Sequence, residues 1–444
     1  MNSVRYSSSG IVAFIILIAA CSSSVDETVH AHLSGDLNVS GQPDTTDFSS
    51  FEILVFSEEG DTLAFATTDP SGHFATDVRA PGRGIYRLTV SRYGQLMAQS
   101  EYLIAEGDSS TFRLSVPSAN RPIVIRSLEN SAWAAYRNAK AAHSAVILEL
   151  ANQQALTGAA FDNAVMSTAE TMWSIRSIFP ETMGAELAAS ESILMLDSRA
   201  DSVLIERARI ITPSMIGYLN VVRAARRAVS RTNGVNAAAT YIRERLAEVD
   251  DETAEATLRA ELVQVYQDSS RHDDALGEAK TMLSRLKGTE LADWAESLIY
   301  ELEVLRPGFD TPNFSVVTLD QDTLATSDVA GETTILEFFD PVDESFRVDL
   351  QQRDSLISLA VQKGIRYVAI STNPDSDINE AFFASESEGE LRAVSATSAG
   401  LVETFNIQSA TRRILLSDSK IIGKYDGRAV GALYTDLIYG NFSN

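Results

Sequence analysis

Short apolar runs alternate with turn sequences between residues 31 and 117. Phe51–Phe56 and Tyr86–Val90 are rich in β-branched and aromatic residues, as strands are. Stretches that contain glycine, proline or aspartate separate such runs, at positions 59–61, 69–72 and 81–84. Short strands at this spacing predict an antiparallel β-sandwich over residues 31–117.

A helical period replaces this pattern between residues 126 and 305. Leu258, Leu262, Val265 and Tyr266 recur at the spacing of one helical face. The sequence around Tyr266 to Leu286 looks like one tetratricopeptide-type hairpin with its turn at 273–276, but no repeat of about 34 residues accompanies it. We therefore expect an irregular all-α region over residues 126–305, tetratricopeptide-like only in part.

Strand and helix patterns alternate from residue 307 to residue 440. Ile335–Phe339 is an apolar strand, a helical pattern follows it, and Ile365–Ile370 is a second apolar strand. Two further apolar runs close the segment at Ile414–Leu416 and Ile421–Ile422. Such alternation predicts an α/β fold with a sheet covered on both faces, so the chain as a whole should be multidomain.

The N-terminus combines a positive charge with a short apolar run. Arg5 precedes the apolar residues 11–20, which end at Cys21. About ten apolar residues are too few to span a bilayer, which needs about 20, but they are typical of a secretory signal peptide. Ile18-Ala19-Ala20-Cys21 resembles the lipobox of bacterial lipoprotein precursors.

This resemblance implies a signal peptide over residues 1–20, lipid on Cys21 and a flexible tether over residues 21–30. The alternative is an ordinary signal peptide with an unrelated cysteine. Ser22 stands where an aspartate would resemble an inner-membrane retention signal, so we expect the outer membrane. The protein is then extracytoplasmic and held at the membrane by its lipid anchor.

The net charge and the cysteine count exclude several kinds of partner and site. The formal net charge is −25, from 61 acidic and 36 basic residues. Non-specific binding to nucleic acid needs a surplus of cations against phosphate, so we exclude nucleic acid as a partner. The chain has a single cysteine, which excludes an intrachain disulfide, a zinc site built from several cysteines and CxxC redox chemistry.

A motif in the predicted sandwich has counterparts elsewhere. Thr67–Phe74, followed by Gly84–Leu88, resembles the carboxypeptidase-regulatory-like domains, with their pattern T-x-x-x-G-x-F and then G-x-Y-x-L. The resemblance implies a non-catalytic accessory module of envelope proteins. Gly82-Arg83-Gly84 is not a dinucleotide fingerprint, because the third glycine is missing and a strand follows instead of a helix.

Residues 307–440 resemble the thioredoxin-like thiol reductases and peroxidases of the bacterial envelope, the TlpA-like and thiol-specific antioxidant group. Thr311–Val316 is similar to the family's entry phrase A-P-x-F-x-L, and Ile335–Phe339 stands where its first core strand ends in F-W. Val368–Ser371 matches its second core strand, and Leu415–Ile421 matches its closing hairpin. The resemblance implies a thioredoxin-like fold for this segment.

The reactive residues of that family are absent. Two cysteines, W-C-x-x-C, should follow the first core strand, and Asp343 and Phe346 occupy their positions here. The family also places a cis-proline beside its redox site, within a P-T pair, and the matching pair is Ala410-Thr411. A cis bond without proline costs about 2.5–4 kcal/mol, so we expect a trans bond at Ala410.

The residues at this degenerate redox site favour a structural role. Asp340 is a good N-cap, and Pro341 suits the first position of a helix. Asp343 and Glu344 would then lie in the first turn, where the helix dipole favours carboxylates. An acid–base or metal role for Asp343 and Glu344 is the alternative.

Two further patterns bear on metals. His30 and His32 could hold an ion, but they fall in a predicted linker, and we interpret them as a solvated pair. Asp375–Asn379 with Glu386 faintly resembles a calcium loop, yet Glu380 stands where glycine is required, so we expect a helix start with Asp377 near its cap. We predict no metal and no cofactor.

Three functional hypotheses follow from these patterns. The first is a lipid-anchored envelope protein that binds or scaffolds another envelope protein through a redox-inactive thioredoxin-like domain. The second is a thioredoxin-family oxidoreductase by descent, acting on thiols, disulfides or peroxides with an external thiol or a metal. The third is a subunit of a larger envelope assembly that exports or processes polymers.

Overall fold

The computed structural model describes residues 28–43, 46–116, 123–287, 289–318, 322–348, 350–384, 391–394, 398–408, 411–427 and 429–440. These residues form two compact units, one that ends at Val265 and one that begins at Tyr266. Cys21, Ala410 and Glu386 lie outside the described residues. Among those described, no helix has the length and the apolar composition that crossing a membrane requires.

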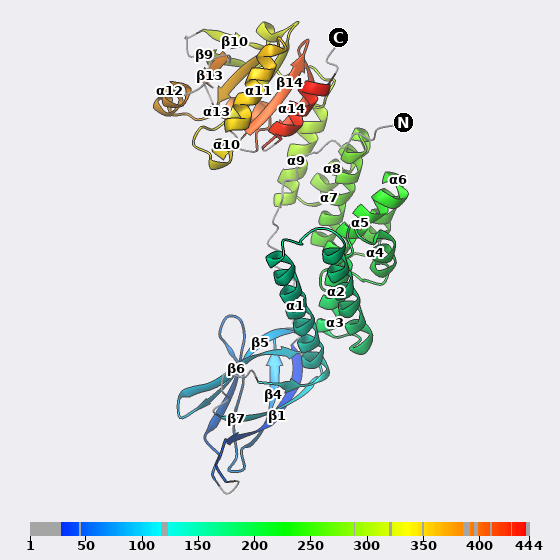
Figure 1. The fold of residues 1–444 in the computed structure, drawn as a ribbon, viewed down its shortest axis with the longest axis vertical. Coiled ribbons are helices and arrows are strands. Elements are labelled where there is room, and N and C mark those ends of the chain that lie inside the picture. Colours follow the sequence, from blue (N-terminus) through cyan, green and yellow to red (C-terminus); the bar gives the residue numbers. More distant parts are fainter. Residues whose placement is uncertain are drawn as a thin grey trace. The chain divides into compact units, whose positions relative to one another are not determined.

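The first unit begins with two four-stranded sheets that share one apolar core (Figure 1). One sheet has the order β4-β1-β7-β8, and the other has the order β3-β2-β5-β6. Alternate side chains of each strand face the core, as in β7, where every second residue is buried. The strands are β1 (Val29–Val39), β2 (Phe51–Phe56), β3 (Thr62–Thr67), β4 (His73–Ala80), β5 (Gly84–Arg92), β6 (Gln95–Ile104), β7 (Ser109–Val116) and β8 (Ile125–Arg126).

One strand pair corrects the prediction of a purely antiparallel sandwich. β1 runs parallel to β7, with His32 opposite Ser109, while it runs antiparallel to β4. The alternation of apolar residues reports which face of a strand is buried, but it carries no information on strand direction. The direction of β7 depends instead on how the chain crosses from one sheet to the other after β6.

The glycine of the T-x-x-x-G-x-F motif is required by its backbone. Gly72 has a φ of +86°, and a Cβ atom there would lie 2.0 Å from the carbonyl oxygen of Leu37. Two residues later, Phe74 is buried, and its ring centroid lies 5.2 Å from that of Phe112. Within the motif, Gly72 therefore allows a tight turn, and Phe74 packs in the core of the sandwich.

Helices follow the sandwich and continue to residue 303. A Ser127 side chain caps the first of them by accepting a hydrogen bond from the backbone N–H of Asn130. The turn expected at 273–276 lies earlier, between residues 268 and 272, and residues 273–276 form the first turn of α8. The helices are α1 (Leu128–Asn152), α2 (Ala159–Ile178), α3 (Met183–Met195), α4 (Asp201–Ala208), α5 (Tyr218–Asn233), α6 (Val235–Leu246), α7 (Glu252–Asp268), α8 (His272–Arg285) and α9 (Glu290–Glu303).

An ionic junction joins the sandwich to the first helices. Arg83, in the turn before β5, donates hydrogen bonds of 2.8 Å to Glu129 of α1 and to Glu186 of α3. It also donates a hydrogen bond to the backbone carbonyl of Glu181. Asn130 continues the junction, because its side chain bonds both the N–H and the C=O of Leu103 in β6 and so acts as a strand partner. These contacts fix α1 and α3 to the sandwich.

The second unit contains a mixed seven-stranded sheet in the order β10-β9-β13-β12-β11-β14-β15. Strands β11, β12 and β13 are parallel, and the other neighbouring pairs are antiparallel. The strands are β9 (Ser315–Thr318), β10 (Thr323–Ala325), β11 (Thr333–Phe339), β12 (Arg366–Ser371), β13 (Leu391–Val394), β14 (Thr411–Ser417) and β15 (Lys420–Asp426). Their helices are the short 3-10 helix η1 (Thr326–Val329), α10 (Glu344–Val348), α11 (Leu350–Gln362), α12 (Ser376–Ala384), α13 (Ser398–Thr404) and α14 (Val430–Tyr439).

Both faces of this sheet are covered, as the run of apolar residues in β11 predicts. Leu336 and Phe338 face one core, while Ile335 and Phe339 face the other. Helices α11 and α14 supply the second core (Figure 1). The strand–helix–strand unit and the closing hairpin thus occupy the places that the sequence pattern assigns to them.

Helix α9 packs against the sheet. Tyr300 and Val304 pack on the first core, and Tyr300 donates a hydrogen bond of 3.0 Å to the carbonyl oxygen of Thr404. Glu301 is paired with Arg412 of β14 and with Lys424 of β15. The sequence places the boundary between the helical and the α/β regions at residues 305–307. The compact units divide instead between Val265 and Tyr266, so α8 and α9 belong to the same unit as the α/β part.

Candidate functional site

The chain turns sharply where β11 ends. Phe339 is the last residue of the strand, and the Asp340 carboxylate accepts hydrogen bonds from the backbone N–H of Val342 at 3.1 Å and from the Asn373 side chain at 2.8 Å. The backbone N–H of Asp343 bonds the carbonyl of Asp340 at 3.2 Å. The Asp340 side chain therefore forms an Asx turn with the backbone of Val342. This corrects the expectation that Asp340 caps the helix.

Asp343 is the residue that begins the next helix. Its carboxylate accepts hydrogen bonds from the backbone N–H of Ser345 at 2.7 Å, from the Ser345 hydroxyl at 2.6 Å and from the N–H of Phe346 at 3.4 Å. Helix α10 starts at Glu344, so Pro341 lies in the turn and not at the first helical position. The hydrogen bonds from Ser345 lower the pKa of Asp343, which keeps it ionised and makes it a poor general acid.

Phe346 belongs to the core. It is buried, and its ring stacks on Phe339 with centroids 4.5 Å apart and planes 22° apart. Phe382 of α12 packs against both rings, at 5.6 Å from Phe346 and 5.2 Å from Phe339. Phe346, which the sequence prediction aligns with the family's second cysteine, is therefore an aromatic core residue that supports the packing of α10.

The end of β11 lies beside the start of β14 in the sheet. Thr411, the first residue of β14, is paired with Phe339, the last residue of β11. The end of β11 and the start of β14 are thus neighbours, because the two strands are antiparallel. Ala410, the position of the family's proline, precedes this pair but lies outside the described residues.

A buried polar network connects this edge of the sheet to α12. The Ser371 hydroxyl donates to Asn379 at 2.6 Å, and the Asn379 amide donates to the carbonyl oxygen of Asn373 at 2.9 Å. The Asp375 carboxylate accepts hydrogen bonds from the N–H groups of Asp377 and Ile378. Asp375 therefore caps α12, and Asp377 lies in the first turn of that helix, which confirms the prediction of a helix start with Asp377 near its cap.

Behind α10 lies a buried ionic cluster that sequence reasoning missed. Glu337 of β11 accepts a hydrogen bond from Arg353 of α11 at 2.7 Å and one from Arg413 of β14 at 2.9 Å. The exposed fractions of the three side chains are between 0% and 1%. Burial raises the pKa of Glu337, but the two guanidinium groups outweigh burial and hold this pKa below its ordinary value.

The guanidinium of Arg353 also contacts aromatic rings. Its central carbon lies 5.4 Å from the centroid of Phe339 and 5.8 Å from that of Phe346. Tyr367 of β12 lies on the same side, and burial together with the charge of Glu337 raises the pKa of its hydroxyl. The cluster and the aromatic rings of Phe339 and Phe346 form one continuous support behind α10. A glutamate inside an apolar strand was the one available signal of it.

The histidines on the N-terminal sandwich occupy a strand. His30 and His32 lie in β1, which corrects their assignment to a linker. His32 bonds Asp77 across to β4 at 3.0 Å, and His73 bonds Asp36 at 3.2 Å. Among the described residues, no group of three histidine, cysteine or acidic side chains is arranged to hold a metal ion.

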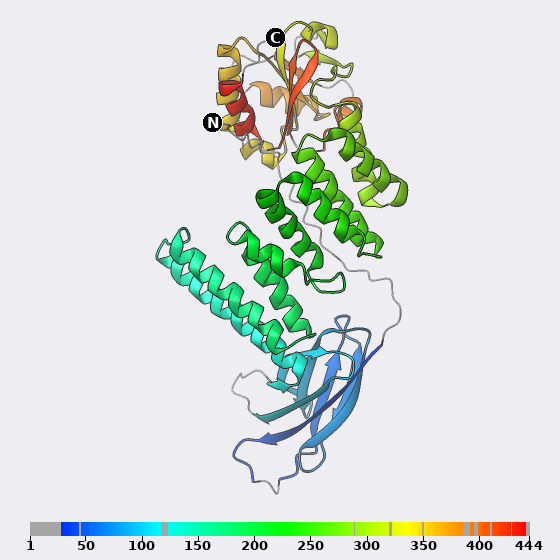
Figure 2. The same ribbon diagram turned by 90° about the vertical axis from the view of Figure 1, so that its right-hand side faces the viewer.

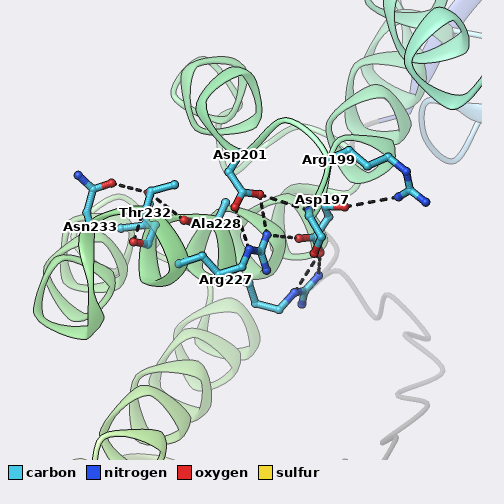
Figure 3. Close-up of polar contacts among 10 residues, drawn as sticks. Asp197, Arg199, Asp201, Arg227, Ala228, Thr232 and Asn233 are labelled. Atoms are coloured by element: carbon cyan, nitrogen blue, oxygen red, sulfur yellow. Dashed lines mark hydrogen bonds and ion pairs between the residues drawn. The ribbon is translucent and has the colours of Figure 1, made fainter. Parts of the chain in front are cut away.

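Charged side chains of the helical region pair with one another. Arg231 of α5 bridges Asp197 at 2.6 Å and Asp201 at 2.7 Å, and Arg227 bonds Asp197 at 2.5 Å (Figure 3). The hydrogen bond from Arg231 lowers the pKa of Asp201. Because these carboxylates are ionised and paired, the network fixes the α3–α4 turn against α5 and offers no free acid or base.

A surface cavity of about 530 Å³ lies between the sandwich and α1. Its walls come from β5, β6 and α1, and Arg87, Glu101 and Arg137 supply charges of both signs. The Glu101 carboxylate accepts hydrogen bonds from Trp133 and from Arg137, so its charge is compensated by a neighbouring side chain.

Several solved structures that resemble this chain are described as thioredoxin-like proteins or thiol-disulfide oxidoreductases. A thioredoxin-like protein of Bacteroides caccae is 8% identical over 58% of this chain and 94% of that protein, with a TM-score of 0.38. The thioredoxin domain of a thiol-disulfide oxidoreductase of Bacteroides vulgatus is 15% identical over 30% and 96% of the two chains, with a TM-score of 0.28. The exposed lipoprotein thioredoxin of Streptococcus pneumoniae is 17% identical over 29% and 98%, with a TM-score of 0.25. No protein-family profile matches the chain, and no curated protein matches it.

Proposed function

We propose that this chain is a lipid-anchored envelope protein whose α/β part is a thioredoxin-like domain without redox chemistry. Its role is binding or scaffolding. The N-terminal sandwich serves as a carboxypeptidase-regulatory-like accessory module, and the helices link it to the thioredoxin-like domain. The partner is another envelope protein.

One observation carries the proposal. The positions that hold the reactive cysteines in the resembling family contain a helix cap, Asp343, and a core aromatic residue, Phe346. Thiol–disulfide exchange requires a thiolate that can reach a disulfide, and the only cysteine of the chain is Cys21. The strand order and the two-sided core around β11 support a retained fold.

Reduction of insulin by dithiothreitol tests the absence of redox chemistry. The purified full chain should give no acceleration over the reagent blank, because it has no dithiol to relay electrons. A thioredoxin with its CxxC motif intact serves as the positive control. The Cys21→Ser chain is the matched control, since it contains no cysteine and separates thiol chemistry from any other effect of the protein.

Turnover of insulin or of hydrogen peroxide by the full chain would contradict the proposal and favour the oxidoreductase hypothesis. Activity that is lost in the Cys21→Ser chain would assign the chemistry to that thiol. Activity that survives the substitution would point to a bound metal, which elemental analysis of the same preparation would detect.

The anchor has its own test. Cells that express the full chain should incorporate labelled palmitate into it and retain it in the outer-membrane fraction. The Cys21→Ser variant should incorporate none, because the lipobox cysteine is the only residue to which the lipid can be attached. Palmitate labelling of that variant would show that the anchor lies elsewhere.

A further inference from the structure

The cavity between the sandwich and α1 has the size of a small-molecule site. It lies where α1 leaves the strands, and Figure 2 shows the helix leading away from the sandwich. Its volume of about 530 Å³ falls within the range of about 300–1,000 Å³ that ligand pockets occupy. The charges and hydrogen-bonding groups in its walls indicate which kind of ligand it could take.

One arginine in this cavity lacks the partner that the sheet offers it. Arg87 of β5 lies directly opposite Glu101 of β6 in the strand register, where opposite charges normally pair. The Glu101 carboxylate instead accepts hydrogen bonds from Trp133 and Arg137 of α1. The Arg87 guanidinium lies over the Phe56 ring at 4.9 Å, and among the described residues it has no hydrogen-bond or ion-pair partner. Helix α1 thus leaves Arg87 with an uncompensated charge.

A free charge of the opposite sign lines the same cavity. Glu58 lies in the turn after β2, and its carboxylate has no hydrogen-bond or ion-pair partner in the part of the chain that the structure describes. Glu58 and Arg87 are therefore not paired with each other, although both line one cavity. A ligand that carries a carboxylate for Arg87 and an ammonium group for Glu58 would compensate both charges.

Neutral groups in the same walls match the polar atoms of a peptide bond. The Gln99 side chain offers an N–H and a C=O, and it has no partner among the described residues. The Ser57 hydroxyl oxygen accepts a hydrogen bond of 3.1 Å from the backbone N–H of Asp61, which leaves its own proton to donate. The half-buried Tyr86 ring is held by a hydrogen bond of 2.6 Å to the carbonyl oxygen of Gly82, and it can pack against an apolar side chain of a ligand.

We propose that the cavity binds a short peptide of two or three residues with both termini free, its carboxylate on Arg87 and its ammonium group on Glu58. An extended peptide of that length spans roughly 7–10 Å. Its N–H and C=O groups bond Gln99 and Ser57. A single free amino acid carries the same two charges but no peptide bond, so it binds more weakly. The site lies in the sandwich and is independent of redox chemistry in the α/β part.

Isothermal titration calorimetry of the full chain with trialanine tests this site. At low salt, where ion pairs are least screened, trialanine should bind saturably with a dissociation constant of about 0.1–1 mM. N-acetyl-trialanine and trialanine amide each lack one terminal charge, and each should bind at least about tenfold more weakly. Free alanine should also bind more weakly than trialanine.

Two substitutions assign each terminus to its side chain. In Arg87→Gln the free peptide should bind only as well as its amide, and in Glu58→Gln only as well as its N-acetyl form. Arg79→Gln, on the other sheet, and Glu59→Gln, beside Glu58 in the turn, are the matched controls, because neither residue lines the cavity. Both controls should keep the full preference for two free termini. All four side chains are exposed, so the variants should fold normally.

Three results would overturn the proposal. The first is the absence of saturable trialanine binding up to about 10 mM. The second is binding that does not weaken when a terminus is blocked, or free alanine that binds as tightly as trialanine. The third is an unchanged preference for free termini in Arg87→Gln or Glu58→Gln, equal to that of its control, because the peptide would then bind elsewhere.

Discussion

Glu337 is the buried carboxylate that holds two arginines, and its removal should strongly destabilise the α/β part. Glu337→Gln keeps the size of the side chain but removes the charge that compensates Arg353 and Arg413. Removing one partner of a buried ion pair typically costs about 3–5 kcal/mol, because the remaining charge stays buried without compensation. Here two guanidinium groups lose the carboxylate that they share, so we expect the upper part of that range. Typical domains are stable by only about 5–15 kcal/mol, so the loss is large.

Tryptophan fluorescence can report on this unit alone. Trp294 lies on α9 in the same compact unit as Glu337, whereas Trp133 and Trp173 lie in the other unit. In a chain with Trp133→Phe and Trp173→Phe, urea unfolding followed by Trp294 should show the Glu337→Gln midpoint lowered by roughly 2 M, given a slope of about 2 kcal/mol per M. Urea is preferred to guanidinium chloride because salt screens ion pairs.

The control is an exposed glutamate with the same kind of partner. Glu332 is 57% exposed and lies 3.5 Å from Arg366. Exposed pairs contribute about 0–1 kcal/mol, so Glu332→Gln should shift the midpoint only slightly. If Glu337→Gln shifts the urea midpoint no more than Glu332→Gln does, the buried ion pairs do not stabilise the α/β part.

Four further predictions concern acid, the junction, the core and the anchor. Folding lowers the pKa of Glu337 below its ordinary value of 4.5, so the ionised carboxylate stabilises the fold above that pH. This stability is lost as the pH falls through the pKa of the folded state, so the urea midpoint reported by Trp294 should drop between pH 7 and about pH 3.5. Arg83→Ala leaves two carboxylates unpaired, and because Arg83 is 33% exposed the cost should be about 1–3 kcal/mol, measured by urea unfolding of the first unit followed by Trp133. Phe346→Ala should cost about 3–5 kcal/mol by urea unfolding, while Val342→Ala at an exposed site should cost little. Cys21→Ser should abolish palmitate labelling while circular dichroism stays unchanged.

The central strands of the α/β part could be predicted from the sequence because strands buried on both faces consist of continuous apolar runs. β11 and β12 are buried on both faces, and their runs of apolar residues match that environment. β14 was only partly predicted, since the run Ile414–Leu416 omits Arg412 and Arg413. Arginine is normally exposed, so a local sequence pattern does not predict that Arg412 and Arg413 are buried. Their burial is possible because Glu301 pairs with Arg412 and Glu337 pairs with Arg413, and both glutamates are distant in the sequence.

The start of α10 is a second case in which the sequence predicts the element but not the role of each residue. The sequence predicts a capped helix after β11, and a capped helix is present, but the cap is Asp343 and not Asp340. Both aspartates are good caps by propensity, and the choice depends on Asn373, which bonds Asp340 from the next strand–helix connection. Such a partner, 33 residues away, is invisible to a local rule.

The junction between sandwich and helices was not predictable for a related reason. Arg83 lies in a glycine-rich turn whose sequence indicates only a change of direction. Its partners Glu129 and Glu186 lie on two different helices, and neither spacing nor periodicity relates them to the turn. Side-chain pairing over such separations is a property of the folded arrangement.

Thiol labelling at positions 343 and 346, which the sequence prediction aligns with the family's cysteines, can show whether this region could hold a reactive thiol. In the Cys21→Ser chain, Asp343→Cys places a thiol at the partly exposed helix start, and Phe346→Cys places one in the core. Maleimide should react with the thiol at position 343 at the rate of an accessible thiol, and with the thiol at position 346 only as fast as the α/β unit unfolds. Equal, rapid labelling of both positions in the folded chain would contradict this prediction, because position 346 would then be open to solvent as a reactive site must be.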